Sequence, residues 1–259
     1  MQVVILCGGQ GTRLKEETEF RPKPMVNIGS HPILWHIMNI YSSFGHKDFI
    51  LSLGYKGEMI KDYFLNYDYI SNDAMVELGT PSRVKLFESH DKRDWRIVLA
   101  NTGEKALKGA RIKRVEKYVQ GDRFMMTYAD GLADVDIDGL LAFHQRHGKL
   151  ATVTGINPSS RFGELAVSGD QVLKFNEKPK GESGYINGGF FVFERGVFDY
   201  LTADDGCDFE YGPLEKMARD GQLMIYKHHG QWACMDTPRD MDYLNKLWSE
   251  NKAFWKKWE

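Results

Sequence analysis

The stretch Gln2-Val3-Val4-Ile5-Leu6-Cys7-Gly8-Gly9-Gln10-Gly11-Thr12-Arg13-Leu14 decides the fold. Its first six residues form a short apolar run rich in β-branched side chains, which is typical of a buried parallel strand. Three glycines follow within the next four positions. In an open α/β sheet, ligands bind beyond the carboxyl ends of the strands, and glycines there let backbone N–H groups approach a phosphate closely. The stretch therefore predicts an α/β domain with an anion-binding loop after its first strand.

Helix and strand patterns alternate along the rest of the chain. A helical stripe starts at His31-Pro32 and ends at Gly45, because apolar residues recur there at spacings of three and four. A strand over 49–53 and a helix over 57–66 complete a βαβ unit, which implies a parallel sheet with right-handed crossovers. Residues 67–101 are less regular, with extended runs at 84–87 and 95–99. The later elements that the pattern predicts are helices near 112–119 and 137–147, strands at 124–128, 151–156, 172–175, 190–193 and 223–226, and a final helix from Met241.

These elements predict one α/β domain over residues 1–259. We expect a Rossmann-like fold with a mixed, mostly parallel central sheet flanked by helices and a small β-rich portion. A nucleotide-type half covers about residues 1–135, and a second half covers about 136–259 and ends in the C-terminal helix.

Composition excludes several classes of protein. The 34 basic and 36 acidic residues leave a formal charge of −2, so no global basic field steers the chain to nucleic acid or to an anionic membrane. No apolar run approaches the length of a membrane span, and the first residues lack the basic region of a secretion signal. The three cysteines, Cys7, Cys207 and Cys234, are too few and too scattered for a disulfide framework or a zinc site. We therefore expect a protein of the reducing cytoplasm.

The glycine loop matches neither of two common nucleotide-binding loops. A Walker A loop requires G-x-x-x-x-G-K-[ST], which does not occur in the chain. A dinucleotide loop requires a third glycine where Leu14 stands and an acidic residue about 20 positions further on, and residues 28–35 contain none. This argues against an NAD-linked oxidoreductase. Arg13 and Lys23, the latter held between Pro22 and Pro24, instead add two cations to the loop.

The loop and several later motifs together resemble the sugar nucleotidyltransferases, or nucleotide-sugar pyrophosphorylases. The resemblance begins with 6–14 and Arg21-Pro22-Lys23-Pro24-Met25 and covers nearly the whole chain, most closely in the branch that transfers CMP from CTP to glucose 1-phosphate. The further matching stretches are 32–38, 54–57, Tyr128-Ala129-Asp130-Gly131-Leu132-Ala133-Asp134, 161–163, Glu177-Lys178-Pro179-Lys180-Gly181, Asn187-Gly188-Gly189-Phe190-Phe191, Met235-Asp236-Thr237 and the tail 254–259.

The resemblance implies a set of site residues. Asp130 and Asp236 would bind Mg²⁺. Arg13, Lys23, Asp130 and Lys178 would be the catalytic residues. Glu177, Lys178, Asn187 and Gly188 would hold the sugar phosphate. The nucleotide would lie on Leu6, Cys7, Gly8, Gly9, Gln10, Gly11, Thr12, Arg13, Lys23, Arg111 and Ala129.

Taken by themselves, two of these motifs remain open. Asp130 follows a buried strand and precedes a glycine, so it is either a magnesium ligand or part of an Asp-Gly turn. The motif over 177–180 is, without the resemblance, an exposed charged turn. Asp134, Asp136 and Asp138 fit a solvated loop and a helix start better than a metal site.

The resemblance also implies CTP and a sugar 1-phosphate as substrates and a homo-oligomer, with a hexamer as one size that it allows. The match weakens at 104–110, where the branch has a loop rich in Ser, Thr and Gly. Here the loop reads Glu-Lys-Ala-Leu-Lys-Gly-Ala, with Ala110 in place of a glycine. Because this loop lies over the nucleotide in the branch, its change leaves the strictness of the CTP preference open. Two alternatives to the implied function also stay open, a CTP-dependent transferase with another phosphorylated acceptor and a nucleotide-sugar sensor without catalysis.

Other constellations favour ordinary structural roles. His144 and His147 lie three apart on a helix and are expected to be solvated or capping, and Cys7 to be a small buried apolar residue. Leu244, Leu247, Trp248, Phe254, Trp255 and Trp258 form a roughly helical apolar stripe, which we expect to pack on its own domain.

Overall fold

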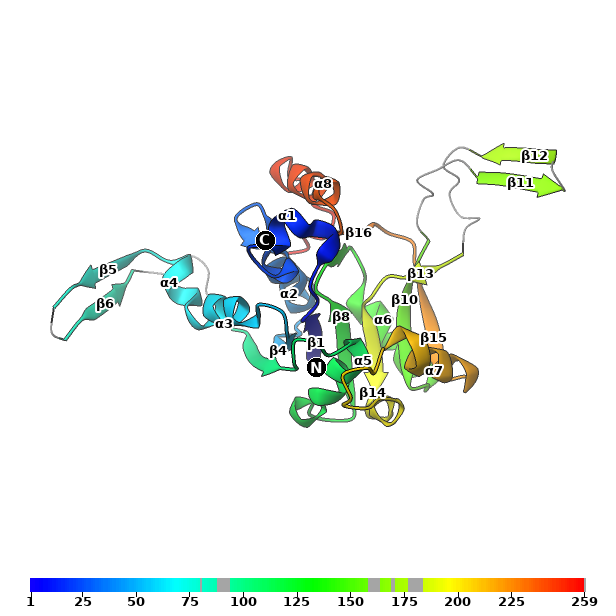
Figure 1. Cartoon of the computed structure of the whole chain (residues 1–259), viewed down its shortest axis with the longest axis horizontal. Helices are drawn as coiled ribbons and strands as arrows, with labels where there is room; N and C mark the ends of the chain where they lie inside the picture. The colour runs from blue at the N-terminus through cyan, green and yellow to red at the C-terminus, as the bar shows by residue number, and fades with distance from the viewer. Residues whose placement is uncertain (80, 88–93, 158–163, 169–170, 177–183, 259) are drawn as a thin grey trace.

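The computed structural model describes residues 1–79, 81–87, 94–157, 164–168, 171–176 and 184–258. A central eight-stranded sheet forms the body of the molecule (Figure 1). All of its strands run in one direction except β13 and β14, so the sheet is mixed and mostly parallel, as predicted. The strands are β1 (Gln2–Cys7), β4 (Asp48–Leu53), β7 (Arg96–Asn101), β8 (Arg123–Tyr128), β10 (Ala151–Ile156), β13 (Ile186–Asn187), β14 (Phe191–Glu194) and β15 (Leu223–His228).

The order of the strands creates a crevice beside β1. The chain leaves β1 for β4 and then β7 on one side, and afterwards returns to place β8 against the other side of β1. Beyond β8 lie β14, β10 and β15. Because the winding direction reverses between β1 and β8, their connections diverge at the carboxyl ends of the two strands, where ligands bind in folds of this kind.

Helices cover both faces of the sheet. Side chains of β1 alternate between the two layers, with Val3 and Ile5 in the core cluster that also holds residues of α2 and α6, and Val4 and Leu6 in the cluster that holds residues of α5 and α7. Burial on both sides explains why the strands read as nearly continuous apolar runs. The helices are α1 (Lys15–Thr18), α2 (Ile33–Ser43), α3 (Gly57–Leu65), α4 (Tyr67–Ser71), α5 (Lys108–Arg114), α6 (Ile137–His147), α7 (Glu215–Arg219) and α8 (Pro238–Ser249).

Most of the predicted elements are present, with small shifts at their ends. Helix α6 and strand β10 have the predicted bounds, and α2 begins one residue after Pro32, which is extended. The loop after β1 is more ordered than predicted. It contains helical turns at Thr12–Leu14 and Lys23–Met25, helix α1, and a short ladder between β2 (Asn27–Ile28) and β3 (His31–Pro32).

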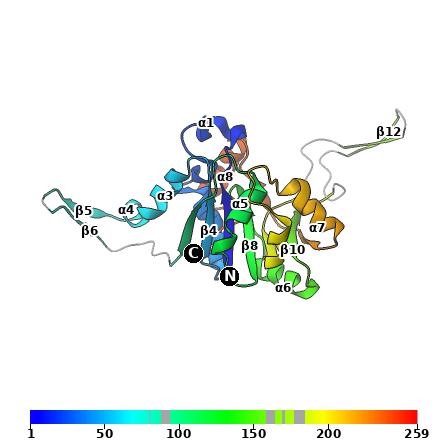
Figure 2. The ribbon, with the colours of Figure 1, turned by 60° about the horizontal axis from the view of Figure 1, so that its bottom comes forward.

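Two hairpins extend away from the body on opposite sides (Figures 1 and 2). One pairs β5 (Ala74–Glu77) with β6 (Arg83–Leu86) beyond α3 and α4. The other pairs β11 (Glu164–Ser168) with β12 (Gln171–Asn176). The first hairpin accounts for the irregular pattern over 67–101, because its strands pack on no sheet face and their side chains are largely exposed.

The C-terminal tail packs on its own domain, as predicted, but it is helical only as far as Ser249. Trp255 comes from the non-helical part and is fully buried, and its indole N–H donates to Nδ1 of His36 on α2. No helix within the described ranges is long and apolar enough to cross a membrane.

The prediction of a solvated or capping role for His144 was wrong. The ring is fully buried, bonded to Thr152 on β10 and near Glu194 on β14. The last turn of α6 lies against these strands, and helical spacing alone does not reveal that contact.

Candidate active site

A cavity of about 810 Å³ opens at the carboxyl ends of β1 and β8. Every predicted site residue that the structure describes lines it. Glu177 and Lys178 lie outside the described residues, so their placement stays a prediction. The predicted residues around the cavity are Leu6, Cys7, Gly8, Gly9, Gln10, Gly11, Thr12, Arg13, Lys23, Arg111, Ala129, Asp130, Asn187, Gly188 and Asp236.

The three loop glycines are required for different reasons. A Cβ on Gly8 would lie 2.1 Å from the guanidinium of Arg111, whereas one on Gly9 would meet no atom within 4 Å. Gly11 has φ +64°, which disfavours side chains, and a Cβ there would also crowd Thr18 and Lys23. Gly9 is therefore the loop position that leaves its backbone open to a ligand, and Gly8 makes room for an arginine.

Arg111 ties together the ends of three strands beneath the cavity. Its guanidinium is 4% exposed and donates to the carbonyl oxygens of Gly8 after β1, Leu53 at the end of β4, and Gly103 and Glu104 after β7. The rigid fork of donors suits several acceptors at once. Arg111 thus holds the glycine loop in place from below.

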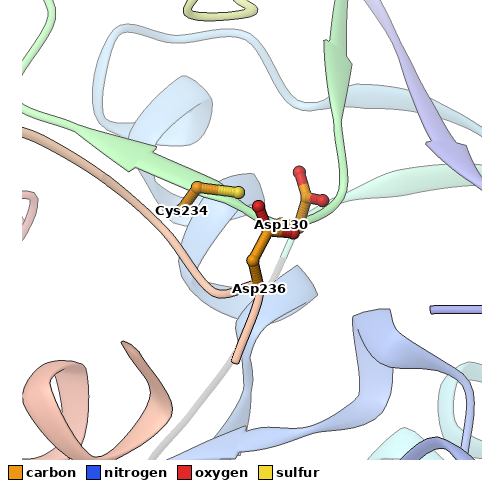
Figure 3. A group of neighbouring side chains, drawn as sticks. All are labelled: Asp130, Cys234 and Asp236. Atoms are coloured by element: carbon orange, nitrogen blue, oxygen red, sulfur yellow. The ribbon is translucent and has the colours of Figure 1, made fainter. Parts of the chain in front are cut away.

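A two-stranded ladder brings the two predicted metal ligands together. Strand β9 (Gly131–Ala133) directly follows Asp130, and β16 (Trp232–Cys234) shortly precedes Asp236. Cys234 pairs with Gly131, so the two aspartates lie at the same end of the ladder. Figure 3 shows both carboxylates and the Cys234 thiol turned toward one another. One ligand atom of each of the three residues lies within 4.8 Å of those of the other two.

Two cations meet the carboxylates at this point. Nζ of Lys23 lies 2.7 Å from an oxygen of Asp130 and 2.7 Å from an oxygen of Asp236, and a guanidinium nitrogen of Arg13 lies 2.9 Å from the same Asp236 oxygen. Burial alone would lower the pKa of Lys23, but the two aspartates raise it above its usual value. Burial likewise works to raise the pKa of Asp236, and the hydrogen bond and charge of Lys23 with the charge of Arg13 lower it. Lys23 and Asp236 are therefore both ionised near neutral pH.

The donor set fits a hard divalent cation. Two carboxylates are the protein ligands that Mg²⁺ commonly uses, with water and phosphate oxygens completing its coordination. Burial and the nearby Asp130 raise the pKa of the Cys234 thiol, so it stays protonated and is a poor ligand for Mg²⁺. The carboxylates of Asp130 and Asp236 are thus the pair that could hold the ion.

The sequence analysis missed several residues of the cavity wall. Tyr128 and Glu210 form a hydrogen-bonded pair, Lys108 contacts the same carboxylate, and the Trp232 indole donates to the Gly188 carbonyl. Tyr128 stands inside a quoted motif and could have been found by its position at the end of β8. Glu210 belongs to a kinked turn over 210–214 that carries no periodic signal.

Comparison with known proteins gives the family of the chain. The family model described as nucleotidyl transferase matches residues 2–245. The chain is 48% identical to the glucose-1-phosphate cytidylyltransferase of Salmonella typhi, and the alignment covers all of both chains. The chain belongs to the nucleotidyl transferase family, in its glucose-1-phosphate cytidylyltransferase branch. A probable glucose-1-phosphate cytidylyltransferase of Bacillus subtilis is 43% identical, again over both full chains.

Solved structures support the fold of this nucleotidyltransferase. The inositol-1-phosphate CTP transferase of T. maritima matches with a TM-score of 0.67 at 15% identity, covering 100% of this chain and 97% of that one. HddC of Yersinia pseudotuberculosis matches with a TM-score of 0.66 at 24% identity, covering 95% and 99%.

The altered 104–110 loop of this nucleotidyltransferase does not obstruct the site in the way that its sequence indicates. Ala110 is fully buried in α5 and does not line the cavity, so its Cβ does not obstruct a ligand. Glu104, Lys105 and Lys108 line it instead. The loop thus presents charged side chains to the cavity.

Proposed function

We propose that this nucleotidyltransferase transfers CMP from CTP to α-D-glucose 1-phosphate, with CDP-glucose and pyrophosphate as products. The observation that carries the proposal is the meeting of Asp130, Asp236, Lys23 and Arg13 at the rim of a cavity floored by the glycine loop. The names of the full-length relatives support CTP and glucose 1-phosphate as the substrates.

The reaction needs positioned charge more than acid–base chemistry. A phosphate monoester is mostly dianionic near neutral pH, since its second pKa is about 6, so no general base is required. An oxygen of the sugar phosphate attacks the α-phosphorus of CTP in line. The new P–O bond forms as the bond to the β-phosphate oxygen breaks, and pyrophosphate leaves with the electron pair.

Each charged residue then has a role in binding or orientation. Arg13 and Lys23 would hold the triphosphate, and Lys178 the phosphate of the sugar. Glu177 and Asn187 would orient the sugar hydroxyls, with Gly188 beside them. Asp130 and Asp236 would hold Mg²⁺, which supplies neutralising charge to the phosphates when bound.

Arg111 supports the nucleotide end from beneath. Gly9 and the backbone up to Thr12 would receive the phosphates, and Leu6, Cys7, Gln10 and Ala129 complete the wall around the nucleotide. Because Arg111 already donates to four carbonyl oxygens, we assign it to holding the loop in position.

The test is pyrophosphate release with Mg²⁺, crossing CTP, UTP, dTTP, ATP and GTP against glucose 1-phosphate and other sugar 1-phosphates. We expect release with CTP and glucose 1-phosphate. Asp130→Asn should lose about 10²- to 10³-fold in rate with an unchanged circular dichroism spectrum, because it removes a preorganised charge. Turnover with CTP and a different acceptor would support the second candidate. Silence of the folded protein across the panel would favour a sensor.

We also propose that the chain forms a homo-oligomer through the hairpin β5–β6. The hairpin extends from the body and exposes large apolar side chains, of which Leu78 is 91% exposed. Such a surface is typical of an interaction site. Light scattering of wild type and of Leu78→Asp would reveal an oligomer and its dependence on the hairpin, and a monomeric wild type would contradict the proposal. We further propose a cytoplasmic location, where free thiols such as Cys7, Cys207 and Cys234 persist.

A further inference from the structure

The cavity contains a second polar group, away from the aspartate pair. The hydroxyl of Tyr128 donates to Oε1 of Glu210 over 2.8 Å, and the Asn187 side-chain amide donates to the Tyr128 hydroxyl over 2.9 Å. Lys108 donates to the same Oε1, and its Nζ lies 5.4 Å from the centre of the Tyr128 ring. Asn187 is itself oriented, because its Oδ1 accepts from the backbone N–H of Gly189. The network fixes the position of the Glu210 carboxylate.

One oxygen of that carboxylate is left without a donor. Oε2 of Glu210 is buried and accepts no hydrogen bond from a donor within the described part of the chain, although the Glu210 side chain also lies within hydrogen-bonding reach of the Asp208 carboxylate. An unpaired buried acceptor is costly, so a ligand that donates to it gains affinity. Asp130 and Asp236 differ in this respect, since neither has a buried oxygen without a partner and both are bonded to Lys23.

The network also determines which part of a ligand would reach Glu210. Tyr128 ends β8, and Asn187 ends β13, which pairs with the far edge of β10. Arg111 and the glycine loop lie on the other side, at the ends of β1, β4 and β7. The Lys108 side chain is 46% exposed and lies on the solvent side of the network. It can therefore move away when a ligand binds the carboxylate. Glu210 therefore lies between Tyr128, which Asn187 contacts, and Lys108 of α5.

We propose that Glu210 accepts a hydrogen bond from a hydroxyl of the sugar 1-phosphate and determines specificity for a sugar that carries this hydroxyl. The inference rests on the proposed function, in which Asn187 contacts the sugar. Hydroxyl donors suit a carboxylate well, because O–H···O⁻ bonds are short and strong. A site built to bond a substrate hydroxyl discriminates steeply against analogues that lack it. Tyr128 acts as a positioning residue that holds Glu210 in place.

The exocyclic amine of cytosine is a second group that can donate a hydrogen bond to a carboxylate. The placement beside Asn187 favours the sugar. The two possibilities give different kinetics. If Glu210 binds the sugar, its substitution alters the response to the sugar phosphate, and if it binds the base, its substitution alters the response to CTP.

The experiment compares wild type with Glu210→Gln, Glu210→Ala and Lys108→Met. Each is assayed with CTP against glucose 1-phosphate and its 2-, 3-, 4- and 6-deoxy analogues, and CTP binding is measured separately by calorimetry. We expect Glu210→Gln to lose about tenfold or more in kcat/KM for glucose 1-phosphate, which corresponds to one lost charged hydrogen bond, with the Kd for CTP within a factor of two. For one deoxy analogue the wild type should already show that loss, and Glu210→Gln should add little to it.

Lys108→Met is the matched control, because it removes a partner of Glu210 but keeps the carboxylate. It should preserve the order of preference among the sugars. An equal loss on all sugars would mean a structural role for Glu210, and a changed Kd for CTP would assign it to the base, and either result overturns the proposal. If wild type itself turns over none of these pairs, the proposed function has failed instead, and the two failures are distinct.

Discussion

Replacing Lys23 by methionine tests whether this lysine occupies the place of a metal cation. In the structure a single ammonium group joins Asp130 and Asp236, at 2.7 Å from each. Lys23 is 11% exposed and the two carboxylates 27% and 23%, so the cluster is mostly shielded from water. Removing the ammonium leaves two like charges facing each other.

The cost can be estimated from these contacts. A hydrogen bond to a charged group contributes about 1.5–3 kcal/mol, so the two contacts together contribute roughly 3–6 kcal/mol. Fixing the long side chain costs up to about 2 kcal/mol. We therefore expect the free energy of unfolding to fall by about 2–3 kcal/mol, less than for a fully buried pair because the carboxylates keep some contact with water. For a chain of this size that corresponds to a decrease in Tm of roughly 5–10 °C.

Thermal unfolding with and without Mg²⁺ is the decisive measurement. In wild type the ion must displace the ammonium of Lys23, whereas in Lys23→Met only Arg13 remains paired with the carboxylates, at Asp236. Mg²⁺ should therefore raise the Tm of the variant by more than that of wild type and recover much of the lost stability. Lys105→Met is the control, because Lys105 lines the same cavity and makes no ion pair among the described residues. Equal shifts for wild type and Lys23→Met would refute the shared use of the two carboxylates.

Two further predictions concern buried groups. Arg111→Met should destabilise the protein by about 3–5 kcal/mol in denaturant unfolding and raise the KM for CTP, because four loop carbonyls lose their donor; stability within 1 kcal/mol of wild type would contradict this. Burial lowers the pKa of His36 to about 4, so the unfolded chain binds more protons between about pH 4 and 6.5. Stability should thus rise with pH across that window, level off above it, and rise less steeply in His36→Gln, by up to about 1.4 kcal/mol per pH unit; identical slopes would contradict the assignment.

The elements of the sheet could be predicted because their causes are local. Strand β1 shows in the sequence as five apolar residues after Gln2, since both faces of the sheet are covered. Helix α6 shows as a stripe, with Asp136 accepting from the Gly139 N–H as its cap and Gly148 ending it. Asp136 thus stands at a helix start, as predicted.

The reasons behind the motifs were harder to predict. The glycines of the loop were expected to let a phosphate approach, and the structure supports that for Gly9. At Gly8, however, the space is taken by Arg111, which is far along the chain and lies beside Gly8 because α5 packs on β1. A residue pattern reveals that a Cβ is excluded without revealing which atom excludes it.

Residues joined by long-range pairing could not be predicted from spacing at all. Asp236 reaches Asp130 through the ladder of β9 and β16, and only the family resemblance pointed to it. Neither residue spacing nor the family resemblance pointed to Glu210. It lies where Tyr211 and Gly212 depart from helical geometry, so neither period applies to its segment.

The two acidic groups divide the cavity according to their partners. Asp130 and Asp236 are compensated by Lys23 and Arg13, so this end exchanges cations and suits phosphates that bring a metal ion with them. Glu210 keeps an unpaired oxygen, so its end suits a neutral donor such as a hydroxyl. A sugar 1-phosphate has these two chemistries at its two ends. Because its attacking oxygen already carries charge, we expect the cavity to orient the molecule rather than activate it, with the aspartate pair and Glu210 facing its two ends.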